Sequence, residues 1–251
     1  MTTTLITGAS SGIGAELARQ LAARGHDLAL CARRTERLEE LRAEIVAAHP
    51  DRIVAVKALD VTDDDAVFRV FHEFDTELSG VDRVVVNAGL GKGAPIGVGG
   101  YAANKATAMT NFIGALAQCE AAMEIFRARK RGHLVVISSM SAMRGMPKTV
   151  TTYAATKAGI AHLAEGIRVE MRGKPDLDIT VSTIYPGYIR SEMNEKVEQR
   201  TKFMVDTETG VRGIVEAIEK GVESARVPAW PWKPLGTAMR HLPLGIVRKL
   251  T

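Results

Sequence analysis

The stretch Thr7-Gly8-Ala9-Ser10-Ser11-Gly12-Ile13-Gly14 decides the fold of this chain. It joins the apolar run Thr3–Thr7 to the amphipathic segment Ile13–Arg24, so it predicts a tight turn from a strand into a helix. The first glycine permits the sharp turn, the second lets a ligand approach the backbone, and the third lets the helix pack on the strand. Because the positive end of such a helix faces the turn, the pattern indicates a pyrophosphate site rather than an ordinary glycine-rich connection.

Outward from this turn, short apolar runs alternate with amphipathic segments. The runs are rich in Val, Ile and Leu at successive positions, as in parallel strands that are covered on both faces. The alternation predicts an α/β fold: a doubly wound (Rossmann), mostly parallel seven-stranded sheet with helices on both faces. The expected strands include Thr3–Thr7, Asp27–Ala32, Ile53–Lys57, Val81–Val86, His133–Ser138 and Ile179–Ile184. The expected helices are Ile13–Arg24, Thr35–Ala48, one that Thr62 caps ahead of Asp63, Asp64 and Asp65, Tyr101–Lys130 and Tyr153–Arg172.

The composition is that of an ordinary globular protein. The 251 residues fit one domain over residues 1–228, followed by a C-terminal arm, residues 229–251, that is too short for a core of its own. The net charge of +4 comes from interspersed acids and bases, so nucleic-acid binding is not expected, and the six scattered histidines give no metal-ligand spacing. With no leader and no apolar run of membrane-spanning length, we expect a cytoplasmic protein in which Cys31 and Cys119 are reduced and buried. The two long helices are typical of a homodimer or homotetramer, although burial within one chain would give the same pattern.

The second expected strand ends in Cys31-Ala32-Arg33-Arg34, with Ala32 where an NAD site usually has an acidic residue. A guanidinium can hold a 2′-phosphate by two hydrogen bonds, whereas a carboxylate would repel it. Arg33, with Arg34 beside it, therefore favours NADP as the cofactor. A solvated arginine pair at the start of a helix is the alternative interpretation.

Tyr153 and Lys157 form a Tyr-x-x-x-Lys pair at the start of an expected helix, where residues four apart share one face. A free phenol is a poor base at neutral pH, but a nearby ammonium and the positive end of a helix favour its ionised form. Upstream, an expected strand leads into Ser139, whose hydroxyl can hold a substrate oxygen. The set predicts hydride transfer between a substrate carbon and a nicotinamide, with Tyr153 transferring the proton.

Together these motifs resemble the short-chain dehydrogenase/reductase family from about Thr3 to about Pro228. They follow the family's order: the TGASSGIG stretch, Asp60-Val61, Asn87-Ala88-Gly89, Asn111, Ser139, the YAATK stretch at Tyr153, and Pro186-Gly187. The resemblance implies an NADP-preferring oxidoreductase that interconverts a carbonyl and a secondary or primary alcohol on a small molecule.

The resemblance also implies roles for individual residues. Ser139, Tyr153 and Lys157 would be catalytic, and Asn111 would bind a water that relays protons from Lys157. Asp60 and Val61 would contact adenine, and Asn87 would lie under the cofactor ribose. The full set of implied cofactor-binding residues is Gly8, Ser10, Ser11, Gly12, Ile13, Gly14, Arg33, Arg34, Asp60, Val61, Asn87, Ala88, Gly89, Tyr153, Lys157, Pro186, Gly187, Ile189 and Ser191.

The position of the serine departs from the family pattern, which usually has serine where this chain has Met140. Ser139 lies one residue before that position and Ser141 one residue after it. We expect Ser139 to be the catalytic serine because it directly follows a strand, with a one-residue insertion in the loop after it. Ser191 stands where the family often has threonine after the Pro-Gly turn, and its hydroxyl can make the same contact.

The segments expected to border the substrate are rich in methionine, which suits either a bulky apolar substrate or ordinary filling of the core. These methionines are Met140, Met143, Met146, Met193 and Met204. In the arm, Leu235, Met239 and Leu242 have helical spacing, and packing over a cleft is favoured over contact with a membrane surface because Pro243 interrupts the apolar face. A catalytically silent NADP-binding redox sensor or scaffold is the alternative function. It would need only the glycine-rich half of the chain.

Overall fold

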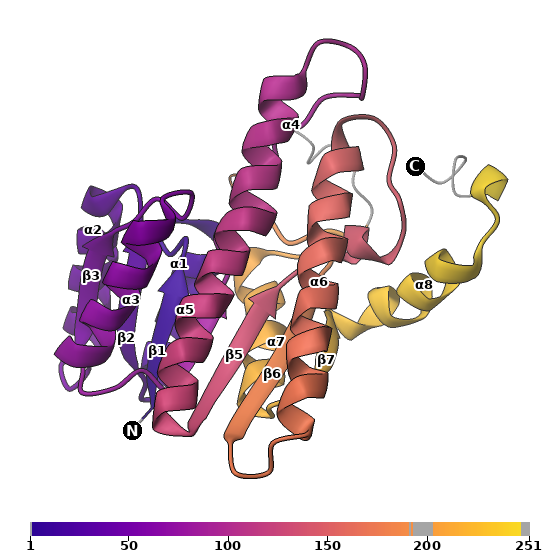
Figure 1. Ribbon diagram of the computed structural model, residues 1–251. Coiled ribbons are helices and arrows are strands. Elements are labelled where there is room, and N and C mark those ends of the chain that lie inside the picture. Colours follow the sequence, from indigo (N-terminus) through magenta and orange to yellow (C-terminus); the bar gives the residue numbers. More distant parts are fainter. Residues whose placement is uncertain (1, 191, 193–202, 247–251) are drawn as a thin grey trace.

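The computed structural model describes residues 2–190, 192 and 203–246. Within these residues one parallel sheet of seven strands has the order β3-β2-β1-β4-β5-β6-β7, which confirms the predicted doubly wound fold (Figure 1). All six strand pairs are parallel. The strands are β1 Thr3–Thr7, β2 Asp27–Ala32, β3 Val54–Ala58, β4 Arg83–Val86, β5 Arg131–Ile137, β6 Asp178–Pro186 and β7 Ser224–Val227.

Helices cover both faces of the sheet, and each face has its own apolar core. Helices α1 (Gly12–Ala23), α2 (Thr35–Ala48) and α7 (Thr207–Glu219) pack on one face through Leu and Ile side chains. Helices α3 (Asp64–Glu77), α5 (Gly114–Arg129) and α6 (Thr151–Arg172) pack on the other, where Phe71, Phe74 and Phe126 are fully buried. Because strand side chains alternate between the faces, runs that are apolar at every position supply both cores at once.

Two predicted helices differ in detail from the structure. The helix expected over Tyr101–Lys130 comprises α4 (Tyr101–Ala108), a π-helical turn η1 (Met109–Ile113) and α5. Such a turn inserts an extra residue into a helix and frequently marks a functional site. The N-cap of α3 is Asp63 rather than Thr62, since the Asp63 side chain accepts from the Ala66 N–H while Thr62 donates to Asp60.

The strand order reverses between β1 and β4, because β2 and β3 lie on one side of β1 and the later strands lie on the other. In open parallel sheets, ligands bind beyond the carboxyl ends of the strands at such a reversal. The glycine-rich turn follows β1, and Asn87-Ala88-Gly89 follows β4, so both motifs meet at this point.

The C-terminal arm forms α8 (Ala229–His241), which extends from the β7 side of the sheet (Figure 1). Trp232, Leu235 and Met239 of α8 pack against the short helix η2 (Met140–Met143), as the spacing of the arm's apolar residues favours. Trp230 is 77% exposed, so only part of the arm is packed as expected. Over the described residues, we find no helix with the length and apolar character needed to cross a bilayer.

Candidate active site

The glycine-rich turn has a backbone that only glycine adopts without strain. Gly8 and Gly12 have φ of +65° and +55°, in the left-handed region. A Cβ on Gly14 would lie 2.4 Å from the Gly8 carbonyl oxygen, so any side chain there would separate α1 from β1. The N-terminus of α1 therefore lies directly against the turn, and the open backbone fits the phosphates of a nucleotide cofactor.

A threonine and an asparagine join the ends of β1 and β4. The Thr7 hydroxyl accepts the N–H groups of Asn87 and Ala88, and the Asn87 amide donates to the Thr7 carbonyl at 2.9 Å. The Asn87 amide also lies against the Cα of Gly14. These contacts hold the two predicted cofactor motifs in a fixed relation at the reversal of the sheet.

The two arginines after β2 are placed differently. Arg34 lies over the glycine-rich turn, where its guanidinium donates to the hydroxyls of Ser10 at 3.3 Å and Ser11 at 2.6 Å. Arg33 is 3.8 Å from the Asp60 carboxylate and more exposed. Asp60 also accepts from Thr62, and these bonds lower the carboxyl pKa although partial burial opposes them. Arg34 is thus the arginine nearer to the predicted pyrophosphate site at the glycine-rich turn, whereas Arg33 lies beside the segment expected to contact adenine.

The proposed catalytic side chains come together where β5 ends and α6 begins. The Lys157 ammonium donates to the Ile137 carbonyl at 2.8 Å and lies 5.9 Å from the centre of the Tyr153 ring. Ser138, which the sequence did not single out, donates to the Lys157 carbonyl at 2.7 Å and ties α6 to β5. The Ser139 side chain interacts with Tyr153 and opposes the rise in its pKa.

The interactions of the two candidate serines differ. The Ser139 side chain is the one that lowers the pKa of Tyr153, and its Oγ accepts from both the N–H and the hydroxyl of Ser141. Ser141 is therefore one hydrogen bond further from Tyr153. Met140, at the usual family position, is buried against Gly236 of α8 and contributes to packing instead.

Burial dominates the protonation of the Tyr-Lys pair. It raises the pKa of Tyr153, and the contact with Ser139 offsets this only in part. It lowers the pKa of Lys157 to about 8. Both shifts favour the neutral forms. A positive charge bound beside the phenol, such as that of an oxidised nicotinamide, would therefore be needed to favour the phenolate.

Asn111 occupies the π-helical turn η1, and its amide is held by Leu90. Its Oδ1 accepts from the Leu90 N–H at 2.7 Å, and its Nδ2 donates to the Leu90 carbonyl at 2.9 Å. Gly89 lies between Asn111 and Lys157, since a Cβ there would be 3.3 Å from the Asn111 oxygen and 3.6 Å from the Lys157 nitrogen. Asn111 and Lys157 thus border the same small space.

The Pro186-Gly187 turn is covered by α8. The Trp232 indole lies so close that a Cβ on Gly187 would be 2.1 Å from its Nε1. Trp232 also packs edge-on to Tyr188, with ring centroids 5.5 Å apart. Ile189 is buried and bridges to Val205. Ser191 and Met193 lie outside the described residues.

The sequence did not single out several residues at this site. Trp232 could be recognised only from the tertiary contact of α8, whereas Arg37, three residues after Arg34, could have been recognised by its helical spacing. Both Arg34 and Arg37 bind the carboxylate of Glu192, which follows the Pro-Gly turn.

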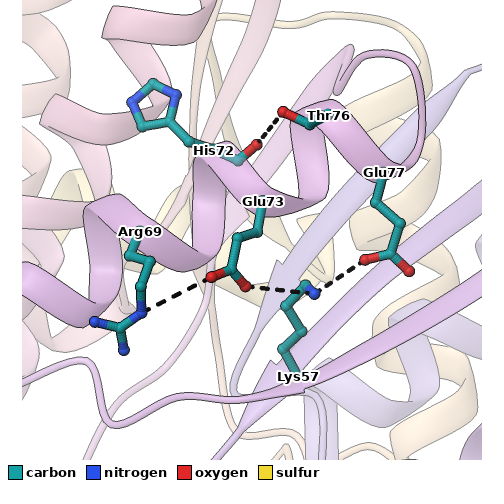
Figure 2. Close-up of a pocket in the computed structure, with 6 residues that line it drawn as sticks. All are labelled: Lys57, Arg69, His72, Glu73, Thr76 and Glu77. Atoms are coloured by element: carbon teal, nitrogen blue, oxygen red, sulfur yellow. Dashed lines mark hydrogen bonds and ion pairs between the residues drawn. The ribbon is translucent and has the colours of Figure 1, made fainter.

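A surface hollow between β3 and α3 is a separate feature (Figure 2). Lys57 lies there between Glu73 at 3.4 Å and Glu77 at 3.0 Å. The charges of these side chains are thus paired, and none of the residues that line the hollow belongs to the proposed catalytic set. Among the described residues, no group of three or more His, Cys, Asp or Glu side chains is arranged to hold a metal ion.

Comparison with known proteins agrees with this geometry. The sequence pattern of the short chain dehydrogenase family matches residues 2–202. An uncharacterised oxidoreductase of Mycobacterium tuberculosis is 51% identical over 98% of this chain and 95% of its own length.

Solved structures give the same assignment. Levodione reductase has a TM-score of 0.79 and 25% identity, over 90% of this chain and 94% of its own. An alcohol dehydrogenase from the archaeon Thermococcus sibiricus, in complex with 5-hydroxy-NADP, has a TM-score of 0.77 and 25% identity, over 90% of this chain and 95% of its own.

Proposed function

This chain belongs to the short-chain dehydrogenase family, and on that premise we propose that it is an NADP(H)-dependent oxidoreductase that interconverts a carbonyl and an alcohol. The observation that carries the proposal is the meeting of Tyr153, Lys157 and Ser139 beside a glycine-rich turn that fits a nucleotide. A silent sensor or scaffold would not need this buried set. Oxidoreductase activity follows from the family.

The choice of NADP rests on the arginines that follow β2. Arg34 is already held against Ser10 and Ser11 of the turn, with Arg33 beside it, and Ala32 supplies no carboxylate to repel a 2′-phosphate. The Thermococcus relative, whose structure holds an NADP derivative, supports the same choice. A nicotinamide cofactor would supply or accept the hydride, and the protein's residues would handle the proton.

We assign the proton transfer to the Tyr153 hydroxyl. In reduction, Tyr153 would donate its proton to the substrate oxygen while Ser139 holds that oxygen by a hydrogen bond. Lys157 would favour the phenolate left behind, because its ammonium lies on the same side of α6. Asn111 would hold the backbone at Leu90 beside Lys157, and we propose that it also binds a water that relays protons from Lys157.

The substrate is proposed to be apolar, because apolar side chains form the contact between η2 and α8 next to Ser139 and the Pro186-Gly187 turn. Met140, Met143 and Trp232 are buried in that contact, and the partly exposed Tyr188 packs on Trp232. We propose that residues 229–251 act as an arm of the catalytic domain that borders the substrate, rather than as a separate unit.

The test is a panel of ketones and aldehydes of graded size, followed by loss of absorbance of the reduced nicotinamide. Wild type should oxidise NADPH in the presence of at least one apolar carbonyl compound, faster than it oxidises NADH. Binding of NADPH without turnover of any compound on the panel would favour the sensor instead.

A further inference from the structure

Two arginines beside the glycine-rich turn hold one carboxylate. Arg34 Nη1 donates to Glu192 Oε2 at 3.0 Å, and Arg37 Nη1 donates to Glu192 Oε1. The other guanidinium nitrogens of Arg34 donate to Ser10 and Ser11 in the turn itself. Each carboxylate oxygen of Glu192 thus has its own guanidinium, and the assembly includes Arg34, one of the two arginines that the sequence assigns to the 2′-phosphate of a cofactor.

Glu192 is charged and only loosely held. The hydrogen bond from Arg37, followed by that from Arg34, lowers the pKa of its carboxyl. The three side chains remain 43–48% exposed, and exposed ion pairs of this kind contribute little to stability. Glu192 also comes from a distant part of the chain, the segment after Pro186-Gly187, so it can leave the arginines without disturbing α2.

A phosphate monoester would use the same donors. It presents three acceptor oxygens and close to two negative charges, against two oxygens and one charge for a carboxylate. The N–H groups of Arg34 and Arg37 that face Glu192 cannot serve both anions at once. The phosphate is the stronger of two competitors for one pair of cations.

We propose that Glu192 determines cofactor affinity and selectivity as an internal competitor of the 2′-phosphate. Its carboxylate occupies Arg34 and Arg37 in the cofactor-free enzyme, and the 2′-phosphate displaces it. NAD(H) lacks that phosphate and leaves the pairs intact. The inference rests on the proposed use of NADP(H) and adds Glu192 and Arg37 to the residues that govern it.

The experiment isolates the adenosine end of the cofactor. Adenosine 2′,5′-bisphosphate and adenosine 5′-monophosphate differ only in the 2′-phosphate, and neither depends on the nicotinamide side of the site. Each is titrated calorimetrically into wild type and Glu192→Gln at one fixed ionic strength, because salt screens the contact. Removal of the competitor should tighten bisphosphate binding about 3- to 10-fold and change monophosphate binding less than about twofold.

Glu44→Gln is the matched control. Glu44 accepts two hydrogen bonds from Arg19, at 2.7 and 2.9 Å, on an exposed surface, so the variant loses the same charge and the same kind of pair. It should leave binding of both nucleotides unchanged. In an Arg37→Ala background, where half of the competition is already gone, Glu192→Gln should give a smaller gain than in wild type.

The outcomes separate this inference from the choice of cofactor. If wild type prefers the bisphosphate but Glu192→Gln leaves that preference unchanged or weaker, Glu192 does not compete and the inference is overturned alone. Equal tightening of both nucleotides would also overturn it, because a general charge effect would then explain the result. If neither wild type nor the variant distinguishes the nucleotides, the proposed use of NADP(H) fails, and the inference fails with it.

Discussion

A basic side chain is buried at each end of the strands, which we call the carboxyl edge and the amino edge of the sheet. The protonation of that side chain differs between the two. At the carboxyl edge, burial lowers the pKa of Lys157 to about 8, and its ammonium donates to the Ile137 carbonyl. At the amino edge, burial and then the charge of Arg83 lower the pKa of His133 to about 3. One group can gain or lose a proton near neutral pH, and the other is kept neutral.

The partners explain the difference. His133 Nδ1 accepts from Arg83 at 3.1 Å, and its Nε2 bonds to the Ser182 hydroxyl, which in turn donates to the Val222 carbonyl. Arg83 also pairs with Glu219 at 2.7 Å. Both ring nitrogens therefore have fixed partners within the fold.

Hydrogen bonding is less complete at the carboxyl edge. Two buried side-chain polar atoms in the described residues have no hydrogen-bond partner, Trp232 Nε1 and Gln118 Oε1, and the first lies beside the Pro186-Gly187 turn. Buried polar groups are usually satisfied, so each exception calls for an explanation. The comparison thus sets an unpaired indole N–H beside the Pro186-Gly187 turn against a His133 ring whose two nitrogens both have partners.

The largest expected effect is at the carboxyl edge. Tyr153→Phe should lower turnover about 10²- to 10⁴-fold, because a positioned proton donor contributes that much, while cofactor affinity stays nearly normal. Steady-state rates and NADPH titration of the same preparation check both parts. Ser139→Ala should be severely impaired and Ser141→Ala only mildly so, and the reverse ranking would show that the serine is wrongly assigned.

The next effect tests the unpartnered indole. Trp232→Ala should cost about 3 kcal/mol of unfolding free energy, since it empties a buried site between Met140 and Tyr188. Trp232→Phe keeps the six-membered ring and loses the pyrrole part, including a donor that has no partner, so it should cost only about 1–2 kcal/mol. Urea unfolding of the two variants measures the difference. Similar losses in both would mean that the N–H has a partner, and the contrast between the two edges would weaken.

The contribution of the amino edge to stability should be lost at low pH. The folded pKa of His133 lies below the unfolded value of 6.5, so the unfolded state binds more protons between these values. Stability should therefore be complete above about pH 7 and fall as the pH decreases, by about 2 kcal/mol at pH 5. Urea unfolding as a function of pH measures this, with His133→Gln expected to flatten the profile and the exposed His162→Gln expected to preserve it. A profile that His133→Gln does not change would remove His133 as the cause.

The sequence predicted the carboxyl edge far better than the amino edge. The glycine-rich turn and the Tyr153-Lys157 pair are local, because their backbone geometry and helical spacing are set by residues close together in the chain. In the sequence, His133 is only one of six scattered histidines. Its role could not be predicted because its partners come from β4, β6 and the segment after α7. The contacts of Trp232 and Glu192 could not be predicted for the same reason, because each side chain contacts residues far away in the sequence.

The smallest expected effect concerns the attachment of the arm. Arg144 follows η2, and its Nη1 donates to the carbonyls of Arg240 at 2.9 Å and Met239 at 3.5 Å, at the C-terminal end of α8. A cation at this end of a helix is favoured by the helix dipole, so Arg144→Ala should cost about 1 kcal/mol. If the arm borders the substrate, the loss should also raise KM for the carbonyl substrate while the Kd for NADPH stays the same.

Two variants serve as controls. Arg144→Lys keeps the charge and should recover part of both effects. Arg212→Ala removes an exposed pair on α7 and should alter neither KM nor Kd. An unchanged KM in Arg144→Ala, with the expected loss of stability, would mean that α8 supports the fold but does not border the substrate.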